Sequence, residues 1–324
     1  MEKQSLFLRI INKRIVIMLF LFVVMFVVFS LLSNGLFIKT KNLMQIVNAM
    51  PLSIFLTTGI TMLMISGRLD FSTGANGTLC SIVISYILRA GLPLVPSVFI
   101  ALVVGVLIGF INAVLVNELR MAAFIATLAT SYVATGLVYL IANKNTIDLL
   151  NPTLKALGKN MIFGGYVPIS ALFALGFMII AGIILHRTRF GRKIYLIGGN
   201  PQAATLSGIN AKMMSYALFM ICGLFSGMAG IMFVARQSSA NMLGITGARY
   251  QGITAAVLGG IAFGGGSGGM AGAFVGLLVL NTFSNGLNVV GLNPYMTNIA
   301  TGLLLILALA LDYFQKKQSM KVIA

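Results

Sequence analysis

Long apolar stretches recur along almost the whole chain, and they restrict its fold more than any other feature. A helix rises about 1.5 Å per residue and the bilayer interior is about 30 Å thick, so one membrane span needs about 20 mostly apolar residues. The eighth stretch is the shortest, and we expect it to span only as a tilted or broken helix. About ten such stretches fit the 324 residues, near positions 15–33, 44–66, 71–90, 94–116, 121–142, 165–185, 213–235, 248–263, 268–290 and 295–312.

Composition excludes a water-soluble fold. Hydrophobic residues make up 59% of the chain and charged residues only 8%, whereas about 25% of a typical globular chain is charged. The sequence therefore predicts an all-α membrane protein in which residues 1–324 form one polytopic domain.

Positive charge indicates how the chain is oriented in the bilayer. Lys and Arg outnumber Asp and Glu by 22 to 5, but no basic helix or aromatic-basic stripe suits a nucleic-acid groove, so nucleic acid is excluded as a partner. Lys and Arg favour the cytoplasmic side. Ten spans place both basic tails and the basic loop at 186–212 on that side, because six spans precede the loop and four follow it. We expect cytoplasmic N and C termini.

Reactive and metal-binding groups are scarce. Cys80 and Cys222 lie in apolar runs without a CxxC pattern or a nearby His, so we expect them to be packing residues. His186 is the single histidine and is expected at the membrane interface. Neither a metal site nor a cofactor is predicted.

Glycine is abundant and follows two patterns. Pairs four residues apart, such as Gly105 with Gly109 and Gly223 with Gly227, are typical of close helix packing in membranes. Two clusters, 67–77 and 259–269, both fit the pattern G-x-(L/I)-x-F-x-x-G-x-x-G and lie 192 residues apart. Such a duplication of glycine-interrupted hydrophobic segments is a feature of transporter folds and predicts an internal repeat.

Polar residues near these breaks are candidates for lining or gating a translocation path. Helix–helix hydrogen bonding is an equally good interpretation of them. The candidates are Ser66, Gly67, Asp70, Ser72, Gly74, Asn76, Gly259 and Gly260, with Thr73, Asn281, Asn285 and Asn288 as further polar positions.

Asp70 is the one carboxylate beside a span in the first cluster. A charge at the bilayer centre costs roughly 2.5–3.5 kcal/mol on insertion scales, so it needs a partner. We expect an ion pair with Arg68 or a capping role at the start of the third span. Gating, substrate contact and a proton relay remain as alternatives.

The loop at 186–212 contains the signals of a short helix. Asn200 is a good N-cap, Pro201 suits the first helical position, Ala203 and Ala204 favour helix, and Gly208 suits the stop. A two-turn helix on the cytoplasmic face is therefore predicted, of a kind that could seat in a groove on a soluble partner.

Several motifs resemble the permease subunits of ribose-type monosaccharide ABC importers, in the binding-protein-dependent inner-membrane transport family. The resemblance covers most of the chain. It rests on residues 66–74 (SGRLDFSTG), 123–128 (AFIATL), 187–192 (RTRFGR) with 198–200 (GGN), 235–240 (ARQSSA) and 258–260 (LGG).

This resemblance implies a multi-pass protein of the bacterial inner membrane that works with three protein partners. These are a second permease subunit in a homo- or heterodimer, a cytoplasmic ATP-binding-cassette ATPase and an extracytoplasmic sugar-binding protein. It further implies that the central loop couples to the ATPase through Arg189, Gly191, Gly199, Asn200, Pro201, Ala203, Ala204 and Gly208.

The chain departs from that family at two places. Phe71 and Thr73 replace the usual Leu and Val, which is a mild change. Where the family commonly has an acidic Y-E-L-D before the Leu-Gly-Gly motif, this chain has Arg249 and Gln251 at the acidic positions. Loss and reversal of charge predict altered partner contacts or an altered substrate class.

The energy for transport is expected to come from outside the chain. The sequence has no P-loop motif G-x-x-x-x-G-K-(S/T), so we expect a non-enzymatic permease working by alternating access. An ion-coupled secondary transporter is the alternative, but it needs intramembrane carboxylates and Asp70 is the one candidate. A membrane enzyme would need a nucleophile with its base or a metal cluster.

Overall fold

The computed structural model describes residues 6–143, 145–149, 151–162, 164–245, 248–293, 295–307 and 310. The predicted all-α class is confirmed, because strands are limited to two short antiparallel pairs, β1 (Ile147–Asp148) with β4 (Ser239–Ala240) and β2 (Met161–Ile162) with β3 (Val167–Pro168). The helices are α1 (Leu6–Leu32), α2 (Thr40–Ile65), α3 (Thr73–Arg89), α4 (Leu94–Asn117), α5 (Ala123–Ala142), α6 (Pro152–Lys159), α7 (Ile169–Arg187), α8 (Arg189–Gly199), α9 (Pro201–Leu206), α10 (Ala211–Gln237), α11 (Arg249–Leu258) and α12 (Met270–Val289), followed by an apolar helix at Tyr295–Leu307.

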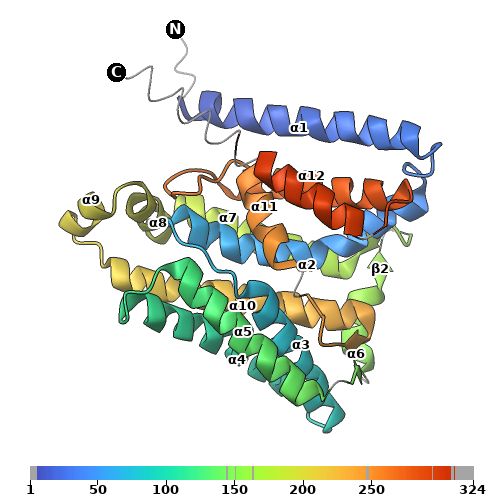
Figure 1. Ribbon diagram of the computed structural model, residues 1–324, viewed down its shortest axis with the longest axis horizontal. Helices are drawn as coiled ribbons and strands as arrows, with labels where there is room; N and C mark the ends of the chain where they lie inside the picture. Colours follow the sequence, from blue (N-terminus) through green and yellow to red (C-terminus); the bar gives the residue numbers. More distant parts are fainter. Residues whose placement is uncertain are drawn as a thin grey trace.

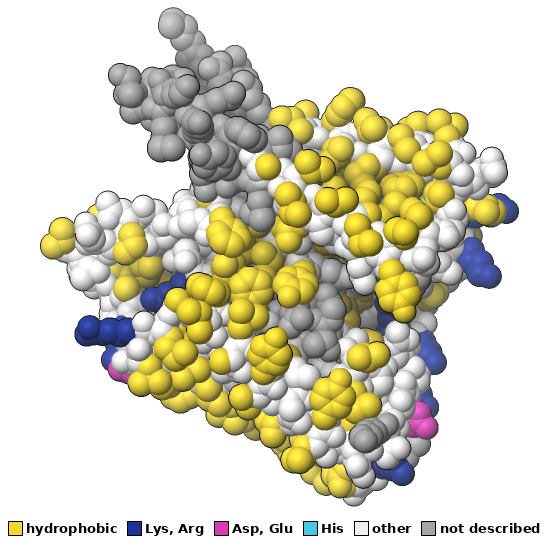
Figure 2. Space-filling view, in the orientation of Figure 1, with side chains coloured by type: hydrophobic (Ala, Val, Ile, Leu, Met, Phe, Trp, Pro, Cys, Tyr) yellow, Lys and Arg dark blue, Asp and Glu magenta, His cyan; other side chains and the backbone are white. Residues whose placement is uncertain are grey.

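The long helices run between two opposite ends of the molecule. In Figure 1, α8 and α9 lie at the left-hand end and α6 and β2 at the right, with α1, α2, α7, α10 and α12 extending between them. Figure 2 shows hydrophobic side chains across the middle of this face, whereas Lys and Arg lie near the two ends. This distribution is the one expected for a protein that crosses a bilayer along the direction of these helices.

Among the described residues, six helices are long and apolar enough to cross a membrane: α2, α4, α5, α7, α10 and α12. The other four predicted spans are also helical where they are described. The first belongs to the 27-residue α1, with Val16–Leu32 as its apolar part, whereas α3 has 17 residues and α11 has 10. The tenth is described as the helix Tyr295–Leu307, and residues 308, 309, 311 and 312 of it lie outside the described residues. A 10-residue helix is only about 15 Å long, so the eighth predicted segment is not a full-length transmembrane helix. The exact number of ten crossings therefore stays a prediction.

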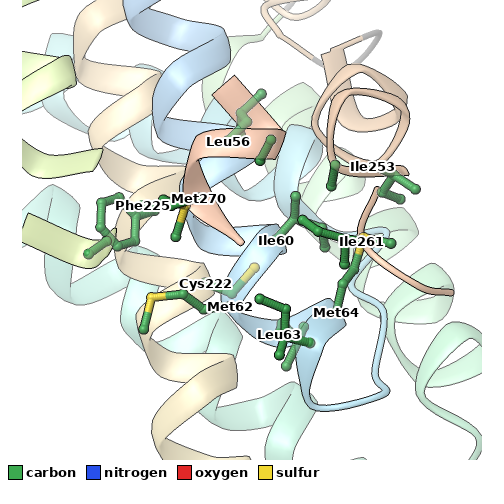
Figure 3. Packing of buried hydrophobic residues seen from close by; sticks show 14 of the residues in the cluster. Leu56, Ile60, Met62, Leu63, Met64, Cys222, Phe225, Ile253, Ile261 and Met270 are labelled. Atoms are coloured by element: carbon green, nitrogen blue, oxygen red, sulfur yellow. The ribbon is translucent and has the colours of Figure 1, made fainter. Parts of the chain in front are cut away.

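Two helices form the centre of the packing. In α2 and α10 the most apolar 18-residue windows are 78% and 72% buried, against 33% in α4, α5 and α7. Figure 3 shows how side chains of α2 meet Cys222 and Phe225 of α10, together with Ile253 and Met270 from α11 and α12. Cys80 and Cys222 are buried and unbridged, as the packing interpretation predicted.

Glycines allow these helices to approach closely. A Cβ on Gly223 would overlap the carbonyl oxygen of Gly105, and a Cβ on Gly109 would overlap that of Phe219, so α4 and α10 touch backbone to backbone. Gly276 meets Ala255 of α11 in the same way. The predicted role of these glycines in helix packing is confirmed.

Candidate functional site

Both glycine clusters begin as the end of a helix. After α2, Gly67 has φ +83°, and the amide of Arg68 donates to the carbonyl of Leu63. After α11, Gly260 has φ +87°, and the amide of Ile261 donates to the carbonyl of Ala256. The two ends share one C-terminal hydrogen-bond pattern. In this pattern Gly67 corresponds to Gly260, whereas the sequence repeat aligned it with Gly259. The segments that lead to the next helix also differ in length. An internal repeat therefore stays a prediction.

Asp70 is buried at the end of the first break and accepts three hydrogen bonds. Its Oδ1 accepts from the backbone amide of Ser72 at 2.7 Å and from the Ser72 hydroxyl at 2.6 Å. Its Oδ2 accepts from Asn112 Nδ2 of α4 at 3.3 Å, and Asn112 Oδ1 in turn accepts from Thr130 of α5. The carboxylate thus fixes the start of α3 to α4 and α5.

The expected ion pair between Asp70 and Arg68 is wrong. In the part of the chain that the structure describes, the one salt bridge joins Lys212 and Glu118. The capping role is closer to what is observed, since Asp70 bonds the amide of Ser72, the residue before the first turn of α3. The polar network compensates the cost of burying this carboxylate without a cation.

The other candidates from the first cluster also bond within the protein. The Ser66 hydroxyl donates to the carbonyl of Leu63, and Asn76 Nδ2 donates to the carbonyl of Gly105 on α4. Gly74 is buried in the first turn of α3, and Gly259 packs against Gly272 of α12. The sequence did not indicate Asn112 and Thr130 as partners, although both are polar residues within apolar spans.

Three glycine-rich segments meet at the end of α2. The amide of Gly266 donates to the carbonyl of Ile65 at 2.8 Å. A Cβ on Gly198 would overlap this same carbonyl oxygen and would lie 2.5 Å from the Gly266 nitrogen, and a Cβ on Gly265 would lie 2.6 Å from the nitrogen of Gly67. We call this contact the glycine junction. It places the end of α8 against both breaks at once.

A side chain of α8 adds a second tie to the same region. The hydroxyl of Tyr195 donates to the carbonyl of Gly268 at 2.7 Å. Burial raises the pKa of Tyr195 to about 12, so the hydroxyl keeps its proton at physiological pH. The ring of Tyr195 also meets the exposed His186 edge-on, with centroids 6.2 Å apart.

The short helix that the sequence predicted between Asn200 and Gly208 is present as α9, whereas the preceding α8 was not predicted. Asn200 Oδ1 accepts from the amide of Ala203 at 2.9 Å, Pro201 occupies the first turn of α9, and Gly208 ends it with φ +75°. Ala204 is buried whereas Ala203 and Leu206 face outward, and Leu206 is 89% exposed.

The packing of α8 against α7 explains why residue 191 is a glycine. A Cβ on Gly191 would overlap the carbonyl oxygen of Leu185, so only glycine allows α8 to fold back against the last turn of α7. The Thr188 hydroxyl caps α8 by accepting from the amide of Gly191 at 3.2 Å, and Arg189 is exposed.

An ion pair fixes the start of α10 to the end of α4. Glu118 accepts from Lys212 Nζ at 2.8 Å and from the hydroxyl of Tyr216 at 2.7 Å. The hydrogen bonds from Lys212 and then Tyr216 lower the pKa of Glu118 below its ordinary value of 4.5.

Because the folded state lowers the pKa of Glu118, this contact stabilises the fold above pH 4.5 and its contribution is lost as the pH falls through the lowered pKa. We expect Glu118→Gln to lower Tm slightly at neutral pH, since the partners are exposed, and to make no difference near pH 3. Thermal unfolding of both proteins at the two pH values tests this. A Tm difference that is equal at both pH values would contradict it.

One cavity lies near the end opposite α9. Its volume is about 650 Å³, within the range of small-molecule sites. The cavity is lined by the last residues of α10, whereas α9 lies just before the first residues of α10, so the two are at opposite ends of this helix. Its lining residues are Gln45, Ile46, Ala49, Leu52, Ser53, Phe233, Arg236, Gln237, Gly244, Ile245, Ala248, Gln251, Asn281, Ser284, Asn285, Asn288 and Asn298.

This cavity brings together only some of the predicted polar positions. Asn281, Asn285 and Asn288 of α12 line it, as does Gln251 at one of the two positions where acidic residues were expected from the resemblance. The candidates of the first break and Gly259 and Gly260 do not line it.

The chain resembles known transport proteins along most of its length. Residues 42–309 match the family described as the permease component of branched-chain amino acid transport systems. The ribose import permease of Bacillus subtilis strain 168 is 30% identical, with 86% of this chain and 87% of that protein covered. The ribose import permease of Escherichia coli K12 is 32% identical over 91% of this chain and 92% of its own length. The D-allose transport system permease of the same organism is 30% identical, with 90% of each chain covered. No solved structure matches.

Proposed function

This chain belongs to the permease family of ABC importers, and from that premise we propose that it forms the translocation path for a sugar or sugar-like solute delivered by an extracytoplasmic binding protein. The observation that carries the proposal is the nearly end-to-end match with ribose import permeases. The polar cavity of about 650 Å³ agrees with it, since a monosaccharide presents hydroxyl groups to amide side chains.

The proposed topology is a multi-pass protein of the bacterial inner membrane. Ten crossings with cytoplasmic termini put α8 and α9 on the cytoplasmic side and the cavity toward the other side. The short α11 contributes to one crossing together with the non-helical residues around it. The proposed assembly contains a second permease subunit, a cytoplasmic ATPase and the binding protein.

We propose that α9 transmits the motion of the ATPase to the cavity. The ATPase would seat on the exposed side of α9, around Leu206. Because Gly198 and Gly199 precede α9 directly and pack against the ends of both breaks, a displacement of α9 would shift the end of α2 and the segment between α11 and α12 together. Residues of α2, α11 and α12 line the cavity, so the opening of the cavity would change when these elements move.

An ion-coupled mechanism finds no separate support in the described structure. Asp70 accepts three hydrogen bonds and lies outside the residues that line the cavity. It serves the packing of three helices rather than a solute.

Changing Leu206 to Asp tests the coupling role. We expect the variant to insert and fold normally, because Leu206 is 89% exposed, and to lose co-purification of the ATPase by about tenfold or more, because a buried charge without a partner is costly at an interface. The measurement is the ATPase recovered with the tagged permease from detergent-solubilised membranes.

Leu119→Asp is the matched control. Leu119 is also exposed, at 64%, and lies beside Glu118 at the same end of the molecule but outside the 186–212 loop. Equal recovery of the ATPase with the Leu206 variant and with the parent would count against the proposed coupling helix.

A further inference from the structure

The cavity is rich in hydrogen-bond donors and carries a positive charge. We propose, building on the function above, that it selects a solute bearing an oxyanion, such as the carboxylate of a sugar acid or a phosphate or sulfonate on a sugar, and that Arg236 is the residue that contacts this group.

Arg236 supplies the charge at the end of α10. Its side chain is exposed at the cavity, and within the described part of the protein it has neither an ion pair nor a hydrogen bond. Asp148 is close by in the fold, since β1 pairs with β4 just after α10, but the two form no salt bridge. The guanidinium is therefore available to a solute, and it remains charged at every physiological pH.

Two asparagines of α12, Asn281 and Asn285, line the same space and have amide hydrogens without a described partner. Asn42 Nδ2 donates both to the carbonyl of Phe37 at 2.8 Å and to Asn285 Oδ1 at 2.9 Å. The carbonyl of Phe37 can only accept a hydrogen bond, so it fixes the orientation of the Asn42 amide. Asn42 then donates to the side-chain oxygen of Asn285, and the amide hydrogens of Asn285 remain free. The Nδ2 of Asn281 is buried and has no partner within the described residues.

None of the described lining residues is Asp or Glu. Gln251 stands at one of the positions where the resemblance led us to expect an acid. It lines the cavity, and its Oε1 accepts a hydrogen bond from the Ser53 hydroxyl at 3.4 Å. An acidic residue here would add a negative charge to the wall that Arg236 shares. Glutamine is neutral and offers a donor beside its acceptor, so no described lining residue balances the charge of Arg236.

These features suit an oxyanion. Guanidinium binds carboxylates, phosphates and sulfonates with paired, charge-assisted hydrogen bonds, and amide donors extend the set. The same cavity repels a cationic amino sugar. A neutral sugar would leave the guanidinium without a charge partner, so we expect it to bind more weakly than its acid.

The experiment measures the potential in the cavity with thiol reagents and needs no known solute. Ser284→Cys places a thiol on the cavity wall, and the two native cysteines are buried. The purified permease is labelled with anionic sulfonatoethyl and cationic trimethylammonioethyl methanethiosulfonate. Each rate is divided by the rate of that reagent with 2-mercaptoethanol.

We expect the anionic reagent to be favoured about tenfold, and the preference to fall to within about twofold of unity when Arg236→Gln is added. Gln251→Asp should reduce the preference as well. Lys41→Gln is the matched control, since it removes one exposed positive charge that does not line the cavity, and it should leave the ratio almost unchanged.

A ratio near unity in the parent, or one unaffected by Arg236→Gln, would overturn the proposal. So would a lack of labelling at both Ser284→Cys and Asn298→Cys, since the cavity would then be closed to solutes.

A second measurement addresses the solute itself. Millimolar D-galacturonate should slow the labelling of Ser284→Cys more than D-galactose does, and D-galactosamine should slow it least; equal protection by all three would contradict selection of an oxyanion. If the charge preference and the protection are found but no solute stimulates the associated ATPase, then the proposed function fails while the cavity assignment stands. If neutral sugars alone stimulate the ATPase, the proposed function stands while the selection of an oxyanion fails.

Discussion

Replacing Gly198 with alanine is expected to lower ATP-driven solute uptake at least about tenfold while leaving the ATPase bound. The added Cβ would overlap the carbonyl oxygen of Ile65, which accepts the 2.8 Å hydrogen bond from the amide of Gly266. All the atoms in conflict belong to backbone, so a side-chain rotation cannot relieve the overlap. Separating them leaves the partly buried amide of Gly266 without its acceptor, and a fully buried amide in that state would cost about 1–3 kcal/mol.

Gly199→Ala is the control at the next residue. There the nearest atom to an added Cβ is the Cα of Gly266 at 4.0 Å, an ordinary van der Waals distance. Both variants keep Asn200 and the rest of α9, so both should retain the ATPase in pull-down measurements. Uptake into proteoliposomes and basal ATP hydrolysis separate the two variants.

The comparison between these neighbours tests the glycine junction itself. If Gly198→Ala transports as well as Gly199→Ala, the contact between α8 and the two breaks has no part in coupling. If Gly198→Ala also loses the ATPase, the junction holds α9 in place rather than transmitting its motion.

Local features of the fold were predicted well from the sequence. Asn200, Pro201 and Gly208 act within a few residues of one another, so the pattern alone defines both ends of α9. The glycine spacing on α4 and α10 likewise predicted a close approach, because in a membrane a small-residue face has one main structural use.

Contacts between distant parts of the chain were not predictable in the same way. Asp70 was expected to pair with Arg68, two residues away, but it bonds Asn112, which is 42 residues away. Gly199 was singled out by resemblance, yet the tight contact belongs to Gly198, because only the packed structure places Ile65 beside it. Arg236 appeared in a motif, but only the folded structure places it on the wall of a cavity.

Changing Asp70 to alanine is expected to cause the largest loss of stability, about 2–4 kcal/mol. The change leaves the amide and hydroxyl of Ser72 without their acceptor inside the packed region between α3, α4 and α5. Asn112 Nδ2 loses its 3.3 Å hydrogen bond to Asp70 and keeps the 2.9 Å hydrogen bond to Ser72 Oγ. Thermal unfolding in detergent, followed by the loss of monodisperse protein, measures the effect.

Asp70→Asn isolates the hydrogen-bond pattern from the volume of the side chain. One oxygen can still accept from Ser72, but the new amide group then faces the amide of Asn112, so two donors oppose each other. Asn112 could turn its oxygen toward residue 70 only by giving up the hydrogen bond that it accepts from Thr130. We therefore expect Asp70→Asn to destabilise the protein nearly as much as alanine does.

The exchange of the two residues provides the decisive comparison. In the double variant Asp70→Asn with Asn112→Asp, the amide at 70 can donate to the carboxylate at 112, which still accepts from Thr130, while the hydrogen bond from Asn112 Nδ2 to Ser72 Oγ is lost. A structural role for Asp70 predicts that this exchange recovers a substantial part of the lost Tm and of uptake, with no change in the pH dependence of transport. A proton relay through Asp70 predicts a shifted pH profile instead, and failure of the exchange to recover any stability would contradict the network described between α3, α4 and α5.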